Sequence, residues 1–508
     1  MSLEGFIFLE VLFKIQNMKK FYITTAIDYV NGSPHLGHCL EKVQADTIAR
    51  FERLRGRDVF FLTGTDENSL KNVKAAKERK MSVKKFVDMN AKKFYSLKDI
   101  LNLSFDDFIR TTENRHRIGA QKLWKLCQKD IYKKKYRGLY CVGCEEFYKE
   151  EELENGCCPE HKKPLEEVEE ENYFFALSSY QEKLKKIIKN DEIEIIPEAR
   201  KNEVLSFIDK GLEDICISRS IERAKGWGIE VPNDKTQIIW VWFDALSNYL
   251  NAISFSKNSN KFKKYWPADV HVIGKGILRF HAIYWPAILL SAKLPLPKKI
   301  FVHGYITIEG EKMSKSLGNI VDPFSLAKKY GGEALRYFLL REIPPTEDGD
   351  FSEERLKMVY RSDLVGGIGN FTARILAMAE KHRIRKEKVK VKKESLIGKE
   401  MVALFKDCES FLENFQFNLA LKRIFKFINF SQRLIEKERP WEEGEEKRKL
   451  VLILLFSLFN LSQVLSPFLP QTALKIKEQL GVKKDFSFRP SFSFDLNLKG
   501  KIILFPKL

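Results

Sequence analysis

The sequence predicts an α/β protein in which a doubly wound parallel sheet is split by an inserted domain and followed by an all-α bundle. Three observations favour this fold class. Short apolar strands alternate with helical segments over 18–129 and again over 216–322. Charged blocks and clustered cysteines interrupt that alternation over 130–215, and helical periodicity dominates from 323 onward. Alternating strands and helices are typical of a parallel sheet, because each parallel crossover is usually a helix.

The first half of the sheet is predicted over 18–129. Residues 21–26 form a short apolar strand that ends in a turn rich in Gly, Ser and Pro. A helix over 38–55 follows because apolar residues recur there at helical spacing, and 59–62 is the next strand. Further helices are predicted over 82–101 and 113–129, on either side of a strand near Phe108.

The second half of the sheet is predicted over 216–322. Its strands are expected at 238–241, 270–273 and 300–302, with a helix that begins after Gly274 and runs to about 290. From 323 the chain is helical, and residues 399–480 fit an amphipathic bundle after a break marked by Gly366, Gly367 and Gly369. The tail over 481–508 is predicted to be extended, because Phe486, Phe488, Phe492 and Phe494 alternate with other residues.

The composition excludes a small disulfide-rich module and a disordered chain. The chain has 508 residues, of which 44% are hydrophobic and 31% charged, so it is long enough for several domains with real cores. Lys and Arg number 88 against 69 Asp and Glu, a net charge of +19. Such a surplus is typical of proteins that meet a polyanion, more often a nucleic acid than a membrane.

No membrane span or signal peptide is predicted. The longest apolar stretch, over 450–469, is interrupted by polar residues and contains Pro467, which indicates a buried helix. Residues 1–17 carry Glu4 and Glu10 where a signal peptide needs basic residues. We therefore expect a cytoplasmic protein in which 1–17 is an extension outside the fold.

Four cysteines crowd into the middle of the insertion. They include Cys141-x-x-Cys144, and after 13 intervening residues the pattern Cys158-x-x-His161 follows. Tetrahedral Zn²⁺ accepts three thiolates and an imidazole, and two-residue spacers hold paired ligands at a suitable separation. The sequence therefore predicts a zinc knuckle, with Cys157 as a rival ligand. The alternative is a degenerate knuckle that folds without metal.

Two motifs point to phosphate chemistry. His35-Leu36-Gly37-His38 lies at a strand-to-helix turn, where helix amides and two imidazoles favour a phosphate. Lys312-Met313-Ser314-Lys315-Ser316 follows the last predicted strand in a glycine-rich stretch, where two ammonium groups can stabilise a departing pyrophosphate. Either motif alone is also compatible with a solvated surface turn or loop.

Together, in this order on a split sheet, the two motifs resemble the class I aminoacyl-tRNA synthetases. From residue 18 onward the chain resembles the methionyl-tRNA synthetase family, through the stretches 26–32, 64–67, 241–249 and 280–286. The resemblance implies a Rossmann-like catalytic domain and a ligase that activates methionine with ATP and Mg²⁺, as methionyl-adenylate. The methionyl group would then pass to tRNA(Met), including initiator tRNA.

The resemblance also implies roles for individual residues. Residues His35, His38, Lys312 and Lys315 are the implied catalytic groups, and Gly37, Met313 and Ser314 join them in binding ATP. An aromatic cage suits the apolar, polarisable thioether of methionine, and a carboxylate suits its ammonium group. The implied methionine pocket consists of Ile27, Tyr29, Asp66, Trp242, Ala245, Tyr249, Phe280 and His281.

In the same resemblance the C-terminal part contacts tRNA. Residues 323–365 would lie along the stem, 366–480 would form the anticodon-binding domain, and 481–508 would pack back onto it. The anticodon-binding positions are Asn370, Arg374, Pro440 and Trp441, with the indole stacking on a base. The chain leaves no room for the additional domain that dimerises some relatives, so we expect a monomer.

The chain departs from the family at several cleft positions. Asn68 and Ser69 stand where the family usually has His and Gly, Gly276 stands where it has Asp, and Asp28 stands where it has an aromatic residue or Pro. His161 also replaces a usual Cys. We expect activity with weakened affinity for ATP or methionine. The alternatives are a sister class I synthetase for leucine, isoleucine, valine or cysteine, and a non-catalytic tRNA-binding relative.

Overall fold

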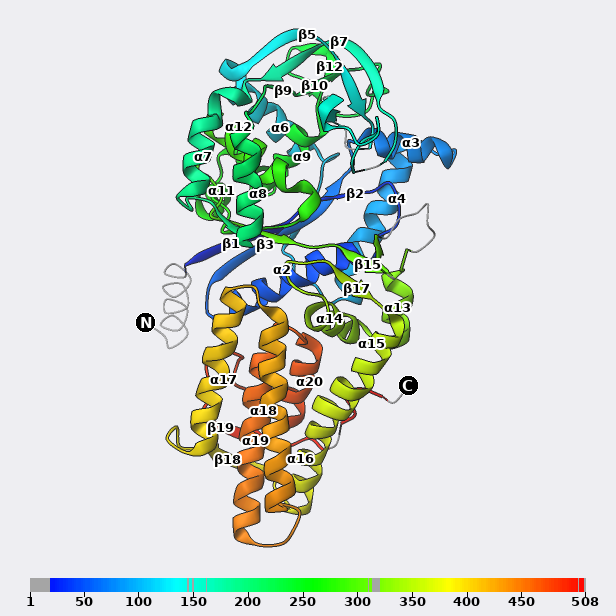
Figure 1. Ribbon diagram of the computed structural model, residues 1–508. Helices are drawn as coiled ribbons and strands as arrows, with labels where there is room; N and C mark the ends of the chain where they lie inside the picture. The colour runs from blue at the N-terminus through cyan, green and yellow to red at the C-terminus, as the bar shows by residue number, and fades with distance from the viewer. Residues whose placement is uncertain are drawn as a thin grey trace, which may run out of the picture.

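The computed structural model describes residues 19–143, 146–148, 150–160, 162–308, 310–312, 320–500 and 502–506. The molecule is elongated: the α/β part lies at one end and a helical bundle at the other (Figure 1). Residues 1–17, predicted as an extension, and the segment 313–319 lie outside the described residues.

A parallel sheet forms the centre of the α/β part. Its order is β2-β3-β1-β13-β14-β8, with β4 beside β3, and every pairing is parallel. The two halves of the chain meet where β1 pairs with β13, which confirms the predicted split, doubly wound sheet. The bounds are β1 Lys20–Thr25, β2 Asp28–Tyr29, β3 Asp58–Asp66, β4 Asp107–Arg110, β8 Glu194–Ile196, β13 Val270–Gly274 and β14 Lys299–His303.

Two sequence predictions about this sheet are wrong. Strand β8 lies within 130–215 yet pairs with β14 at the sheet edge, so that range is not entirely an insertion. Three residues are too few to show a strand pattern. The run 238–241 does not join the parallel sheet: β12 (Asp234–Ile239) pairs antiparallel with β10 (Ser218–Ser220) and β11 (Glu230–Val231). Its apolar run continues directly into helix α9, and periodicity cannot separate the two.

Helices cover both faces of the parallel sheet (Figure 1). The predicted helix over 38–55 is α2, Leu36–Leu54, which is buried along most of its length. The other helices of the α/β part are α3 Leu70–Glu78, α4 Val83–Tyr95, α5 Leu97–Ile100, α6 Asn114–Leu126, α7 Gln181–Lys189, α8 Glu198–Asp209, α9 Val241–Leu246, α10 Asn248–Asn251, α11 Asn260–Tyr265 and α12 Trp285–Ser291.

The insertion is built around an antiparallel sheet. Strand β5 (Ile131–Cys141) pairs with β6 (Glu146–Tyr148) and with β7 (Glu166–Phe175), and β7 pairs with β9 (Ile215–Cys216). Two basic residues of β5 lie opposite glutamates of β7 across the ladder, Lys135 opposite Glu171 and Arg137 opposite Glu169. The basic residues of β5 and the acidic block over 169–171 are therefore in part complementary cross-strand neighbours.

The C-terminal part is the predicted all-α bundle. Its helices are α13 Pro323–Tyr330, α14 Gly332–Arg341, α15 Glu353–Val359, α16 Asn370–Lys381, α17 Leu396–Glu413, α18 Phe417–Glu438, α19 Glu445–Leu465 and α20 Pro470–Leu480. The expected glycine break is instead a π-helical segment, Tyr360–Gly369, that joins α15 to α16. The extended tail is confirmed, because β19 (Ser493–Asn497) pairs with β18 (Lys386–Lys390).

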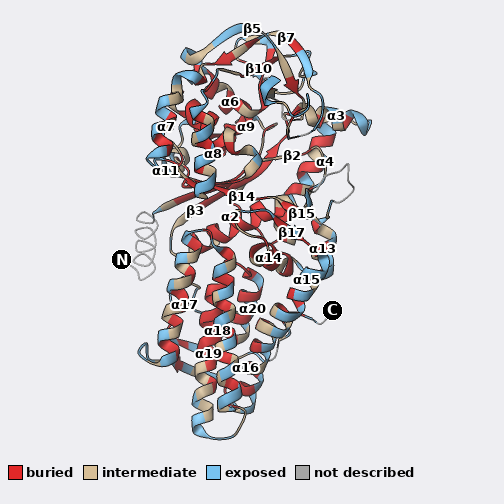
Figure 2. Ribbon diagram, in the orientation of Figure 1, coloured by how far each residue is buried: buried red, intermediate tan, exposed pale blue. Residues whose placement is uncertain are grey.

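Helix α19 lies inside the bundle. Among the described helices it has the length and composition to cross a membrane, yet 72% of its most apolar window is buried within the molecule. Figure 2 shows the inward faces of these helices as buried and the outer faces as exposed. A buried core helix, as predicted for 450–469, fits this placement.

A buried arginine joins the two parts of the molecule. The guanidinium of Arg336, on α14, donates to the carbonyls of Phe468, Pro467 and Leu101 at 2.8–3.0 Å. It also pairs with Asp46 of α2 at 2.7 Å, and both side chains are fully buried. Burial would raise the pKa of Asp46, but Arg50 and Arg336 lower it to about 2. Helix α2 is thereby fixed to the bundle by a charge-assisted contact.

Candidate active site

A cleft of about 940 Å³ opens at the carboxyl ends of the parallel strands. This is the edge where open α/β sheets bind ligands, because the strand-to-helix loops converge there. The cleft brings together every described side chain predicted to bind methionine, together with three of the four residues of the first phosphate motif. Its predicted lining residues are Ile27, Tyr29, His35, Gly37, His38, Asp66, Trp242, Ala245, Tyr249, Phe280 and His281.

The two histidines of the first motif form the beginning of α2. His35 is the N-cap, and its Nδ1 accepts the backbone N–H of Gly37 at 3.1 Å. Nδ1 of His38 accepts the backbone N–H of His35 at 3.0 Å. Because each Nδ1 is an acceptor, the proton of each neutral ring is on Nε2. The backbone thus fixes both imidazoles as Nε2 donors at a helix N-terminus, where anions bind.

Aromatic rings form one wall of the cleft. The indole of Trp242 stacks on Phe280 with ring centroids 3.7 Å apart and an interplanar angle of 5°. Tyr29 meets the same indole edge-on at 6.2 Å. Flat, polarisable surfaces of this kind suit a thioether side chain.

A neutral histidine lies at the inner end of this wall. Nδ1 of His281 is 3.0 Å from the carbonyl of Ile277, and its Nε2 is 2.7 Å from the hydroxyl of Tyr249. The carbonyl can only accept, so Nδ1 carries the proton and Nε2 accepts from Tyr249. Burial lowers the pKa of His281 to about 4. The side chain is therefore neutral at physiological pH.

Asp66 lies at the end of β3, and the segment after it is tied to helix α9. Asp66 is buried and accepts the backbone N–H of Asn68. The Asn68 amide donates to Asp244 at 2.7 Å and to the carbonyl of Thr111 at 3.2 Å. Asp244 also contacts His116 at 2.5 Å. Asn68, a departure from the family, therefore still connects the Asp66 segment to the helix that carries Trp242.

Gly276, a second departure, lies against Tyr305. A Cβ atom at this glycine would be 2.0 Å from the Tyr305 hydroxyl oxygen and 3.4 Å from Cζ. The backbone N–H of Tyr305 donates to Asp348 at 2.8 Å, and the Lys275 ammonium group lies 4.7 Å from the centroid of the Tyr305 ring. The phenol therefore takes the space into which an Asp side chain at 276 would begin.

The second motif extends from the hairpin that follows β14. Strand β15 (Ile306–Ile308) pairs with β16 (Glu311–Lys312), which places the backbone of Lys312 opposite Thr307. Met313, Ser314 and Lys315 lie outside the described residues. Ile306 and Ile320, before and after this stretch, both line the cleft.

Two of the predicted zinc ligands lie together. Cys141, at the end of β5, and Cys158 pack with Tyr148 in one small buried cluster. Cys144 and His161 lie outside the described residues, and among those that are described no group of three His, Cys, Asp or Glu side chains is arranged to hold a metal. Neighbouring residues of the same segment, including Gly143 and Lys163, line the cleft.

The predicted anticodon-binding residues lie on α16 and directly after α18, in the helical part of the molecule away from the parallel sheet (Figure 1). Asn370 is exposed, and Arg374, one turn later on α16, pairs with Glu436 of α18 at 2.7 Å. The carbonyl of Pro440 accepts from His382 at 2.7 Å. Trp441 is half-buried. Two contacts, Arg374 with Glu436 and His382 with Pro440, therefore join α16 to the end of α18 and the residues that follow it.

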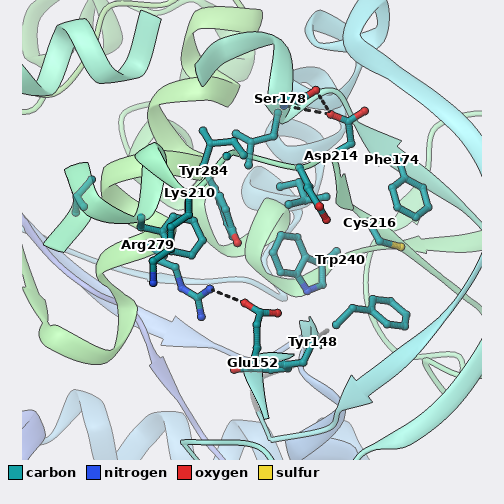
Figure 3. A pocket seen from close by; sticks show the side chains of 18 of the residues that line it. Tyr148, Glu152, Phe174, Ser178, Lys210, Asp214, Cys216, Trp240, Arg279 and Tyr284 are labelled. Atoms are coloured by element: carbon teal, nitrogen blue, oxygen red, sulfur yellow. Dashed lines mark hydrogen bonds and ion pairs between the residues drawn. The ribbon is translucent and has the colours of Figure 1, made fainter. Parts of the chain in front are cut away.

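Figure 3 shows a second cavity, of about 1260 Å³, between the insertion and the catalytic part. Trp240 and Tyr284 point into it, and Arg279 lies 4.0 Å from Glu152 at its rim. Arg279 and Tyr148 line this cavity and the cleft alike. The two cavities therefore share a wall, a feature that no sequence motif indicates.

Comparison with known proteins agrees with this geometry. The family described as tRNA synthetases class I (M) matches residues 21–165 and 161–376, and the anticodon-binding domain of tRNA ligase matches 395–502. The chain is 43% identical to the methionine--tRNA ligase of Caldanaerobacter subterraneus, over 96% of this chain and 79% of that protein. It is 40% identical to that of Brucella suis, over 92% and 93% of the two chains.

The fold is also similar to solved structures. Methionyl-tRNA synthetase of Mycobacterium tuberculosis in complex with methionyl-adenylate superposes with a TM-score of 0.91 at 37% identity, over 96% of this chain and all of that one. The apo form of the same enzyme gives 0.84 at 34% identity, over 97% and 99% of the two chains.

Proposed function

The chain belongs to the methionyl-tRNA synthetase family, and we propose that it activates methionine with ATP and transfers it to tRNA(Met), including initiator tRNA. The observation that carries this proposal is the juxtaposition in one cleft of the aromatic wall with two imidazoles fixed as Nε2 donors. The cleft can thus hold an amino acid with an apolar side chain next to a nucleotide phosphate.

The residues that line the cleft account for the recognition of methionine. The thioether would lie against Trp242, Phe280 and Tyr29, and its ammonium group would pair with Asp66. Neutral His281, with Tyr249, closes the inner end without presenting a charge. A neutral wall favours an uncharged side chain, because an unpaired buried charge is costly.

Activation needs no general base. The methionine carboxylate attacks the α-phosphorus of ATP, the new bond joins its oxygen to phosphorus, and the bond to the bridging oxygen breaks as pyrophosphate leaves. His35 and His38 donate from Nε2 to the α-phosphate, while Lys312 and Lys315 stabilise the leaving pyrophosphate. Mg²⁺ accompanies the phosphates of ATP. Catalysis is then positioning and charge stabilisation.

Transfer places the methionyl group on the 2′-hydroxyl of the terminal adenosine of tRNA. Trp441 would stack on an anticodon base, and Asn370 and Arg374 would bond base edges, as single-stranded loops are usually recognised. The exposed Asn370 and the contacts that join α16 to the end of α18 and to Pro440 support this assignment.

We also propose a structural Zn²⁺ held by Cys141, Cys144, Cys158 and His161, in a monomeric, cytoplasmic enzyme. The buried, adjacent positions of Cys141 and Cys158 support the metal site, since thiolates are preferred zinc ligands. Elemental analysis of the purified protein should find about one zinc per chain, reduced in Cys158→Ser. Fully active protein without metal would contradict this assignment.

The function is tested by ATP/pyrophosphate exchange with Mg²⁺, supplying methionine, leucine, isoleucine, valine and cysteine separately. Exchange that depends on methionine alone is expected. Exchange with a different amino acid would contradict the specificity and point to a sister synthetase. Folded protein without exchange would contradict catalysis and favour a tRNA-binding role.

A further inference from the structure

A buried ion pair lies directly behind the first phosphate motif. The ammonium group of Lys42, on α2, contacts the carboxylate of Asp28 in β2. The Lys42 side chain is only 1% exposed, and Asp28 is 10% exposed on the wall of the cleft. Burial lowers the pKa of Lys42, but the Asp28 and Glu41 carboxylates outweigh this and raise it, so that the group stays charged.

The pair joins the two elements that carry the two substrates. Asp28 lies between Ile27 and Tyr29 of the methionine pocket, and β2 is a strand of two residues. Lys42 lies one turn beyond His38 on the helix that begins with the phosphate-binding histidines. The ion pair thus connects the methionine strand to the phosphate helix.

The charge of Asp28 also acts on the phosphate site itself. Its Oδ1 is 3.9 Å from Nε2 of His38, the atom that would donate to the α-phosphate. An uncompensated carboxylate at this position would repel ATP, because charges a few ångströms apart in a partly buried site are weakly screened. Lys42 supplies the compensating charge from behind the wall.

We propose that Lys42 and Asp28 are positioning residues for amino-acid activation: Lys42 neutralises Asp28 and so sets ATP affinity, while Asp28 holds β2 against α2. This inference rests on the proposed function, since it assumes that ATP binds at His35 and His38. Asp28, the departure noted in the sequence, would thus be tolerated because Lys42 accompanies it.

The test separates charge from packing. Lys42→Met should raise the KM for ATP in methionine-dependent exchange about tenfold or more, with KM for methionine changed less than about threefold, because the Asp28 charge is then unpaired. Asp28→Asn should leave KM for ATP at or below the wild-type value and lower kcat. The double variant should return KM for ATP to within about threefold of wild type.

An exposed ion pair provides the matched control. Lys84→Met removes the same charge from the Lys84–Asp88 pair on α4, whose lysine is 60% exposed, and should leave both KM values unchanged. Circular dichroism establishes that each variant is folded. Should Lys42→Met not fold, Lys42→Gln replaces it, because an amide still donates to Asp28 without supplying charge.

Two results would overturn the inference. One is an unchanged KM for ATP in folded Lys42→Met or Lys42→Gln. The other is an equal loss of kcat in both single variants with neither KM changed, which indicates a purely structural pair. Methionine-dependent exchange by the wild-type protein is measured before any variant is compared. If the wild-type protein shows none, the proposed function is overturned instead.

Discussion

The contact between Gly276 and Tyr305 allows a sharp test of the cleft geometry. Substituting Gly276→Ala would place a Cβ 2.0 Å from the Tyr305 hydroxyl oxygen, where contacts between heavy atoms normally begin at about 3.5 Å. The backbone at Gly276 is not left-handed, so any penalty comes from space and not from the loss of glycine's conformational freedom. The phenol must move, which disturbs the contact of its ring with the Lys275 ammonium group.

Overpacking of this kind usually costs about 1–3 kcal/mol, which corresponds to a factor of roughly 5–150. We therefore expect kcat/KM for methionine-dependent pyrophosphate exchange to fall at least about fivefold in Gly276→Ala, and further in Gly276→Asp, the residue usual in the family. Tyr305→Phe removes the obstructing oxygen and leaves Cζ as the nearest atom, at an ordinary 3.4 Å.

The rescue experiment decides the matter. Combined with Tyr305→Phe, Gly276→Ala should recover most of its lost kcat/KM, measured against Tyr305→Phe alone. If the double variant is as impaired as the sum of the two single variants, the two side chains do not compete for one space, and the reasoning is refuted.

Three further predictions concern other parts of the molecule. Unfolding returns the pKa of His281 from about 4 to its ordinary value of 6.5, so the unfolded chain binds a proton more readily and acid favours unfolding. Between pH 7 and pH 5, the free energy of unfolding should therefore fall by roughly 2 kcal/mol less in His281→Gln than in wild type. Chemical denaturation at the two pH values measures this, and an equal fall in both proteins would contradict it. Asn68→Ala should raise KM for methionine about tenfold by leaving Asp244 without that donor, whereas Asn68→His should keep a donor there; equal KM values for the two variants would argue against the bridge. Trp441→Ala should abolish methionylation of tRNA and leave pyrophosphate exchange near normal, and loss of both activities would mean that the indole is structural.

Local patterns predicted the elements that are regular and long. Helix α2 and strands β1 and β13 follow from apolar periodicity, since burial on one face repeats at fixed intervals along the chain. Strand β8 was not predicted, because three residues between helices are too few to show a hydrophobic pattern. The pairing of β12 was also missed, because an apolar run does not encode its partner.

The candidate site, too, could be predicted from the sequence only in part. The first phosphate motif was recognisable because its residues lie together in the sequence, whereas the residues of the aromatic wall, Tyr29, Trp242 and Phe280, were implied by the family resemblance. The partners of the unusual residues were not: Asp28 and Lys42 are 14 positions apart, and Asn68 and Asp244 are 176 apart. Their proximity depends on how the strands and helices pack, which residue types alone do not reveal.

The buried Arg336 has a consequence for how the molecule comes apart. One guanidinium bonds to α2, to Leu101 at the end of α5, and to the loop between α19 and α20. Separating the bundle from the catalytic part would expose a desolvated cation whose partners belong to both. Separating the two parts would therefore break bonds of Arg336 to both of them. We expect the slowest-exchanging amides of α2 and of α19 to belong to a single cooperative unit.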